Sequence, residues 1–173
     1  MSEEKKPVTE EEFWRMRLVM AHVSGRGLHS AVYDTDPETW NHIQNETAGI
    51  LARYLHPNMS VLDAGCAYGA VYSIMPKVKN YIGIDVSPHF IEIAKLRHPE
   101  ADFRVADLTS LNEFCNKQFD VVICRSVKEM IEDNKGNELW CKMENELHRV
   151  GRRIIYIGYA ATGSDYRVVQ CRS

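Results

Sequence analysis

The fold of this chain is predicted best from residues 61–69, which read Val61-Leu62-Asp63-Ala64-Gly65-Cys66-Ala67-Tyr68-Gly69. The apolar residues from Met59 to Leu62 are typical of an inner parallel strand. The two glycines lack side chains that would block the close approach of a ligand to the backbone. A helix is expected from Tyr68 to Met75, before Pro76, with its free N–H groups facing that ligand. The stretch therefore predicts a strand, a turn and a helix that together bind a ligand.

This arrangement resembles the first motif of the class I methyltransferases that depend on S-adenosylmethionine (SAM), which carry an acid two residues before the first glycine. Here that acid is Asp63. The nicotinamide-binding fingerprint fits less well, because its first, third and sixth glycines correspond to Gly65, Ala67 and Ala70. Ala67 also replaces a glycine that is usual in the methyltransferase motif. By itself, this turn would fit a generic strand-to-helix corner equally well.

A second apolar strand, Tyr81 to Asp85, ends in an acid about 22 residues after Asp63, as a βαβ unit requires. A carboxylate at the end of this strand can accept hydrogen bonds from both ribose hydroxyls, and the resemblance implies that role for Asp85. The alternative is that Asp85 only caps the next helix. Ser87 and Pro88, however, already supply an N-cap and a proline at the first helical position.

Two further segments follow at the spacing of the same family. Residues 102–108 predict a short strand followed by Asp107, which the resemblance places near the adenine amine, with Leu108 against the ring. The alternative for Asp107 is an ordinary turn aspartate before Thr109. Residues 119–124 predict a fourth strand that resembles the family's fourth motif, so residues 124–127 are expected to face the reacting methyl group.

The remaining elements complete a shortened sheet. Residues 137–149 predict an amphipathic helix, residues 152–160 a fifth strand, and residues 166–171 a last strand running antiparallel to the fifth. The expected fold class is α/β, a Rossmann-like, mostly parallel sheet in the order 3-2-1-4-5, flanked by helices and shortened after strand 5. The exposed C-terminal edge strand could pair with a second copy in a homodimer, or Arg167 and Arg172 could simply keep it soluble.

Residues 1–58 are expected to form an N-terminal helical segment, or lid, packed on a SAM-binding core of residues 59–173, as one globular domain. A first helix is predicted over residues 11–22. A second begins at Asp36 and Pro37, an N-cap followed by a first-turn proline. Residues 29–34 between them are expected to form a loop that carries Tyr33 over the cofactor. The second helix should pack on the sheet through Trp40, Ile43, Thr47, Ile50, Leu51 and Tyr54.

Composition narrows the function classes. With 173 residues, 45% hydrophobic and 26% charged, the chain is typical of one soluble domain, and no apolar run or leader segment argues against a cytoplasmic protein. Five cysteines without a Cys-x-x-Cys pair, and seven histidines without ligand spacing, give no reason to expect a disulfide framework or a metal. The net charge of −3 and the absence of a dense basic cluster make nucleic acid an unlikely partner.

The resemblance implies one set of residues for the cofactor and another for the acceptor. The cofactor set, for SAM or its product S-adenosylhomocysteine (SAH), is Tyr33, Asp63, Gly65, Cys66, Ala67, Tyr68, Gly69, Asp85, Val86, Asp107, Leu108, Cys124 and Arg125. The acceptor set is His29, Trp40, Arg125, Ser126 and Lys128. Cys66 and Cys124 also fit small buried filler residues. Arg125 could hold an acceptor carboxylate or pair with Glu129 one helical turn on.

Three functions agree with these patterns. The first is a SAM-dependent methyltransferase that acts on a small molecule by in-line displacement of the sulfonium methyl group. The second is methylation of a protein or RNA, and the third is a non-catalytic partner or sensor with the same fold. No catalytic residue is assigned. If the acceptor arrives protonated, the candidate bases are His29, Tyr33, Lys128 and Glu129.

Overall fold

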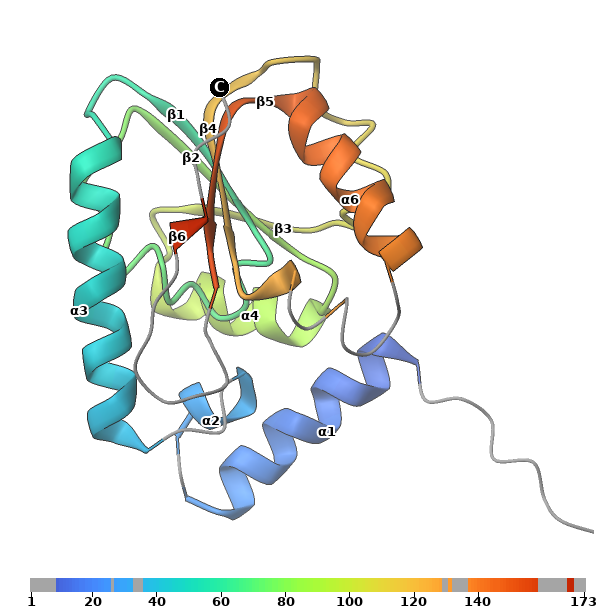
Figure 1. The fold of residues 1–173 in the computed structure, drawn as a ribbon. Coiled ribbons are helices and arrows are strands. Elements are labelled where there is room, and N and C mark those ends of the chain that lie inside the picture. The colour runs from blue at the N-terminus through green and yellow to red at the C-terminus, as the bar shows by residue number, and fades with distance from the viewer. Residues whose placement is uncertain are drawn as a thin grey trace, which may run out of the picture.

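The protein is described by a computed structural model in residues 9–25, 27–32, 36–128, 131, 137–158 and 168–169. A six-stranded sheet in the order β3-β2-β1-β4-β5-β6 lies at its centre (Figure 1). The first five strands are parallel and lie in the order 3-2-1-4-5, as predicted. The strands are β1 (Ser60–Ala64), β2 (Asn80–Asp85), β3 (Asp102–Val105), β4 (Phe119–Arg125), β5 (Gly151–Ile157) and β6 (Val168–Val169).

The order in which strands are added to the sheet reverses at β1. Leu62 pairs with Ile82 of β2 on one side and with Val122 of β4 on the other. The chain therefore runs outward to β3 along one edge and then returns to place β4 beside β1. Ligands of open α/β sheets bind at such a switch point, beyond the carboxyl ends of the strands.

The short β6 pairs antiparallel with β5, where Tyr156 lies opposite Val169 and Ile157 lies opposite Val168. The other residues of the strand expected over 166–171 lie outside the described part of the chain, as do Arg167 and Arg172.

Helices cover both faces of the sheet. On one face α3 (Pro37–Tyr54) packs Ile50 and Leu51 against strand residues such as Ile123. On the other, α6 (Asn137–Val150) packs Leu147 against the opposite side of the same strands, including Val122. The helix α4 (Pro88–Arg97) packs on β2 and β3, and α1 (Glu10–Val23) and α2 (His29–Val32) lie below the carboxyl ends of the strands (Figure 1).

The predicted starts of α3 and α4 are confirmed. Asp36 Oδ1 accepts hydrogen bonds from the backbone N–H groups of Glu38 and Thr39, and Pro37 occupies the first turn of α3. Ser87 Oγ accepts from Phe90 N at the start of α4. Asp36 and Ser87 are therefore the N-caps that the sequence predicts. Among the described helices none is long and apolar enough to cross a membrane.

Three local predictions are wrong. The helix expected from Tyr68 to Met75 is a series of turns, because Gly69 has a φ of +78°, which a right-handed helix excludes. The loop expected over residues 29–34 begins with the short α2, while residues 33–35 lie outside the described part. Tyr54, expected on the packed face of α3, is 37% exposed at the last position of that helix.

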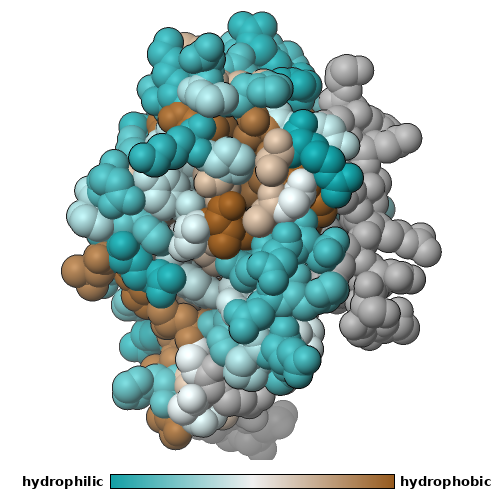
Figure 2. Space-filling model, turned by 90° about the vertical axis from the view of Figure 1, so that its left-hand side faces the viewer, coloured by the Kyte–Doolittle hydropathy of each residue, from teal (hydrophilic) through white to brown (hydrophobic). Residues whose placement is uncertain are grey.

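The outer surface shown in Figure 2 is largely hydrophilic, with hydrophobic groups gathered in a central hollow and along the lower left margin. The exposed large apolar side chains of the described residues belong mostly to α1. They are Phe13, Met16, Val19, Met20 and Val23. This helix therefore buries a different side, which contributes Trp14 and Ala21 to the core.

Candidate functional site

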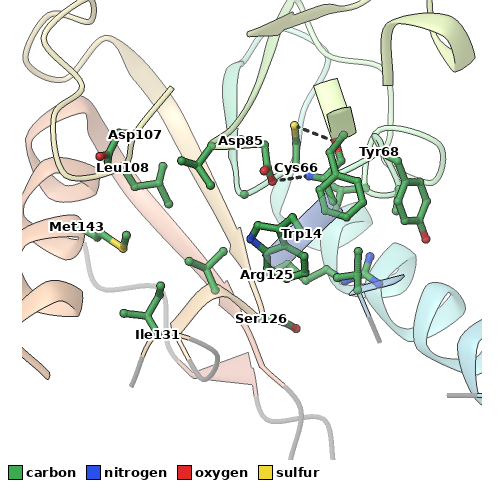
Figure 3. Close-up of a pocket in the computed structure, with 18 residues that line it drawn as sticks. Trp14, Cys66, Tyr68, Asp85, Asp107, Leu108, Arg125, Ser126, Ile131 and Met143 are labelled. Atoms are coloured by element: carbon green, nitrogen blue, oxygen red, sulfur yellow. Dashed lines mark hydrogen bonds between the residues drawn. The ribbon is translucent and has the colours of Figure 1, made fainter. Parts of the chain in front are cut away.

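A cavity lies at the carboxyl ends of β1, β2 and β4, at the predicted switch point (Figure 3). Its walls combine residues from the glycine-rich turn, from the ends of β2 and β4, and from α1 and α6. The lining residues are Trp14, Val32, Gly65, Cys66, Ala67, Tyr68, Ala70, Val71, Asp85, Val86, Phe90, Asp107, Leu108, Arg125, Ser126, Val127, Ile131 and Met143.

Gly65 forms the tight turn that leaves β1. Its φ is +78°, and a Cβ at this position would lie 2.4 Å from Cγ2 of Val127. Both the conformation and the space therefore require glycine. Ala67 follows with a φ of +46°, so the residue that replaces the family's glycine still adopts a left-handed conformation.

The sequence predicts that the free N–H groups of this turn face the ligand. In the structure several of them instead donate to backbone carbonyl oxygens. Gly65 N and Cys66 N both donate to the carbonyl oxygen of Ile84, over 2.8 and 2.9 Å. Gly69 N donates to the carbonyl oxygen of Cys66. The turn folds back on the end of β2, because no helix begins there and its donors find partners inside the protein.

Asp85 holds this turn together from the end of β2. Its Oδ2 accepts from Ala67 N, and its Oδ1 accepts from Ser87 N, each over 2.9 Å. Each carboxylate oxygen has a second lone pair, and Asp85 lines the cavity. The cap of α4 is Ser87, so Asp85 anchors the turn and also lines the cavity.

Asp63 lies in β1, is only 1% exposed, and is not among the residues that line the cavity. Its Oδ2 accepts from the Tyr81 hydroxyl over 2.8 Å, whereas its buried Oδ1 has no hydrogen-bond partner among the described residues. Burial raises the pKa of Asp63 to about 7, although the Tyr81 hydrogen bond and the nearby Arg125 charge oppose this shift. An ammonium group of a ligand could donate a hydrogen bond to this buried Oδ1 atom of Asp63.

Asp107 forms the turn that was the alternative prediction. Its Oδ1 accepts from both the backbone N–H and the hydroxyl of Thr109, over 2.8 Å in each case. Asp107 is exposed to solvent, yet together with the buried Leu108 it also lines one end of the cavity (Figure 3).

Trp14 covers the cavity from α1 and was not among the predicted site residues. Its side chain is 7% exposed, and its ring lies 5.5 Å from that of Phe90, between centroids (Figure 3). On the same helix Arg17 donates to the carbonyl oxygens of Ala31 and Ser30, which ties α2 to α1. The sequence could have indicated that Trp14 is buried, because tryptophan is highly buried on average, but not that it lies over the cavity.

Three planar groups stack beside the cavity. The Arg125 guanidinium lies over the Trp40 ring, with its Cζ 5.1 Å from the ring centroid. The His29 ring also stacks on Trp40, with 5.8 Å between the ring centroids and 18° between the ring planes. Arg125 is 5% exposed and lines the cavity, as does Ser126, whose φ is +57°. Three of the residues predicted from separate parts of the chain therefore meet at the end of β4.

Several predicted residues lie apart from the cavity. Gly69, Cys124 and Lys128 do not line it, and the Lys128 Nζ lies over the Trp140 ring at 5.8 Å. Tyr33 and Glu129 lie outside the described residues. The remaining lining residues that sequence reasoning missed are apolar, because core and pocket apolar positions look alike in a sequence. They are Val32, Ala70, Val71, Phe90, Ile131 and Met143, whereas Val127 lines the cavity as expected for residues 124–127.

Among the described residues a single thiol, that of Cys66, lines the cavity, and it is not activated. Burial raises the pKa of the Cys66 thiol well above its ordinary value, and the charges of Asp63 and Asp85 raise it further. Cys66 is therefore a small buried residue here and not a nucleophile. Within the described residues, no group of three His, Cys, Asp or Glu side chains is arranged to hold a metal ion.

Comparison with known proteins gives a consistent result. The family model described as methyltransferase domain matches residues 62–154, more than half of the chain. Methyltransferase 235L of Invertebrate iridescent virus 6 is 36% identical over 69 residues, which cover 38% of this chain and 25% of the viral protein. The ubiquinone biosynthesis O-methyltransferase of Xanthomonas campestris pv. campestris is 29% identical over 89 residues, or 49% of this chain and 37% of that enzyme.

Among solved structures, the YcgJ protein of Bacillus subtilis superposes with a TM-score of 0.58 at 23% identity. The match covers 68% of this chain and 52% of YcgJ, and at this identity it shows a shared fold alone. The chain thus spans about a quarter to a half of the length of the proteins that it matches.

Proposed function

This chain belongs to the methyltransferase domain family, the class I enzymes with SAM as cofactor, and we propose that it transfers the methyl group of SAM to a small-molecule acceptor. The observation that supports the proposal is the cavity at the carboxyl ends of β1, β2 and β4, where Gly65, Asp85 and Arg125 meet beneath Trp14. A concave cavity with mostly apolar walls suits a small molecule better than a protein or RNA chain.

The residues present fit the cofactor in three respects. A side chain at Gly65 would fill the space beside Val127, so glycine keeps the turn open to a ligand. Asp85 lines the cavity at the end of β2, and its two carboxylate oxygens are the acceptors that two ribose hydroxyls need. The unpartnered Oδ1 of Asp63 offers a buried acceptor for the ammonium group of the methionine end.

When bound, SAM supplies a methyl group on a positively charged sulfonium, which an acceptor lone pair displaces while the thioether leaves. The protein then has to align the acceptor and exclude water. Trp14 and Phe90 close one side of the cavity with apolar surface, and Val127, Ile131 and Met143 close another. These walls are the residues that we assign to water exclusion.

A base is needed only for an acceptor that arrives protonated. Among the candidates, His29 has a buried Nε2 with no hydrogen-bond partner in the described residues, but its ring stacks on Trp40 behind the cavity wall. We therefore propose an acceptor whose nucleophilic atom is free at neutral pH, or whose proton leaves to water.

The test is to incubate the purified chain with SAM and a panel of small hydroxy, amino and thiol compounds, and to measure SAH production. The proposal expects SAH to form above the acceptor-free rate with at least one class. Binding of SAM without transfer to any class, together with transfer to bulk protein or RNA, would favour a macromolecular acceptor.

A further inference from the structure

We propose that the acceptor carries a carboxylate, held by Arg125 and Ser126 at the end of β4. This inference rests on the proposed function and deepens it, because it names the substrate class. The notable feature is a buried cation inside a cavity whose other walls are mostly apolar.

The Arg125 guanidinium is fixed in place before any ligand arrives. It lies over Trp40, and Trp40 is itself stacked on His29, so elements from two helices hold the plane of the cation. Figure 3 shows the Arg125 side chain running past Trp14 along the edge of the cavity. A planar guanidinium held in this way presents paired N–H donors that match the two oxygens of a carboxylate.

Ser126 adds a hydroxyl donor at the next position. Its backbone N–H already donates to the carbonyl oxygen of Ile157, over 2.8 Å. Its Oγ is shielded from solvent and has no hydrogen-bond partner among the described residues. With a φ of +57°, Ser126 also adopts a backbone conformation that is uncommon for non-glycine residues. The hydroxyl is therefore placed to bind a ligand.

Arg125 is the one cationic side chain among the described residues that line the cavity, and its charge also acts on the buried Asp63. The other charged lining residues are Asp85 and Asp107, and both accept hydrogen bonds from backbone N–H groups of the turns beside them. The cavity is also lined by the apolar side chains of Val127, Ile131 and Met143. The matching ligand is a small molecule with an apolar body and one carboxylate.

The carboxylate of SAM itself could be a second source of the same chemistry, so the test separates the two. SAH-loaded protein is titrated by calorimetry with benzoate and with its neutral counterpart benzamide. We expect wild type to prefer benzoate by about tenfold or more. In Arg125→Gln the preference should fall to within about twofold while SAH still binds, and in Ser126→Ala benzoate should weaken by roughly threefold.

Arg152→Gln is the matched control, because the Arg152 side chain is 63% exposed and pairs with Asp120 at the opposite end of the sheet. It should keep the wild-type preference. Arg125→Lys keeps the charge but not the fork of N–H donors, so it should retain part of the preference for benzoate. This variant replaces Arg125→Gln in the test if Arg125→Gln does not fold.

Equal affinity for the two probes in wild type, binding of neither, or a preference that persists in Arg125→Gln would overturn the inference. A loss of SAH affinity in Arg125→Gln with the benzoate preference intact would instead assign Arg125 to the cofactor's carboxylate and overturn it too. Failure of wild type to bind SAH is a different result, because it refutes the proposed function itself.

Discussion

The backbone N–H of Ala67 donates to Oδ2 of Asp85 over 2.9 Å, so the turn after β1 is fastened to the end of β2 by the residue expected to bind ribose. The Asp85 carboxylate therefore holds the turn in place and is also the group expected to bind the cofactor. In most glycine-rich turns of this kind the backbone N–H groups are available to the ligand. Here Asp85 orders the turn and also lines the cavity.

Replacing Asp85 by alanine should lower SAH affinity by about 10- to 100-fold, because charge-assisted hydrogen bonds worth about 1.5–3 kcal/mol are lost. Asp85→Asn should lose nearly as much, since an amide cannot accept from both Ala67 N and Ser87 N through two oxygens. Calorimetric titration with SAH measures both. Asp102→Ala is the control, as Asp102 is exposed and paired with Arg104. Unchanged affinity in Asp85→Ala would contradict the ribose assignment.

Three glycine-to-alanine variants separate backbone strain from crowding. Gly49 lies in α3 with no atoms near a new Cβ, so Gly49→Ala should stabilise the protein by about 0.5–1 kcal/mol. Gly25 has a φ of +67° and open space around it, so Gly25→Ala should cost only the strain, about 1–2 kcal/mol. Gly65→Ala should cost more than Gly25→Ala by a further 1–3 kcal/mol or so, because its Cβ meets Val127.

Urea unfolding of the three variants gives these free energies directly. A double variant of Gly65→Ala with Val127→Ala should be less destabilised than the sum of the two single variants, because the smaller residue makes room. If Gly65→Ala and Gly25→Ala cost the same, the crowding at Val127 is not significant.

The order of the strands could be predicted from the sequence because the inner strands contain apolar runs and the family spacing is regular. The caps at Asp36 and Ser87 were equally clear, since side-chain capping is a local interaction. The helix expected after Gly65 failed for a physical reason. Gly69 adopts a left-handed conformation, and a Cβ there would meet His98 and Phe103, which lie about 30 residues further along the chain.

The candidate site was predicted where it depends on strand ends and missed where it depends on packing. Asp85, Arg125 and Ser126 follow from the rule that ligands bind at the carboxyl ends of parallel strands. Trp14 was missed, because its position over the cavity is set by how α1 crosses the strand ends. No local pattern in α1 encodes that crossing, and five apolar residues of the same helix remain exposed.

Trp14 should report cofactor binding through its fluorescence, since its indole lines the cavity and packs on Phe90. A variant that retains only this tryptophan, Trp40→Phe with Trp140→Phe, should change its emission intensity or maximum when SAH is added. Trp140 packs against Tyr156 and does not line the cavity, so a variant that retains only Trp140 should change little. Equal responses of the two variants would show that α1 does not contact the ligand.

Asp63 should give stability an unusual pH dependence. Burial raises its pKa from 3.8 to about 7 in the folded protein, so between these values the folded state binds more protons than the unfolded state. The free energy of unfolding should therefore fall as pH rises from about 4 to 7, by at most about 4 kcal/mol from this group. In Asp63→Asn this decrease should disappear.

The measurement is urea unfolding of wild type and Asp63→Asn at several pH values from 4 to 8, with the difference between the two taken at each pH. Asp120→Asn is the matched control with the opposite sign. Hydrogen bonds from the backbone N–H and the hydroxyl of Ser60 lower the pKa of Asp120, so its contribution is present above pH 3.8 and lost only in stronger acid. Parallel curves for wild type and Asp63→Asn between pH 4 and 7 would show that the Asp63 carboxylate is solvated, and that it is no buried acceptor for a cofactor ammonium.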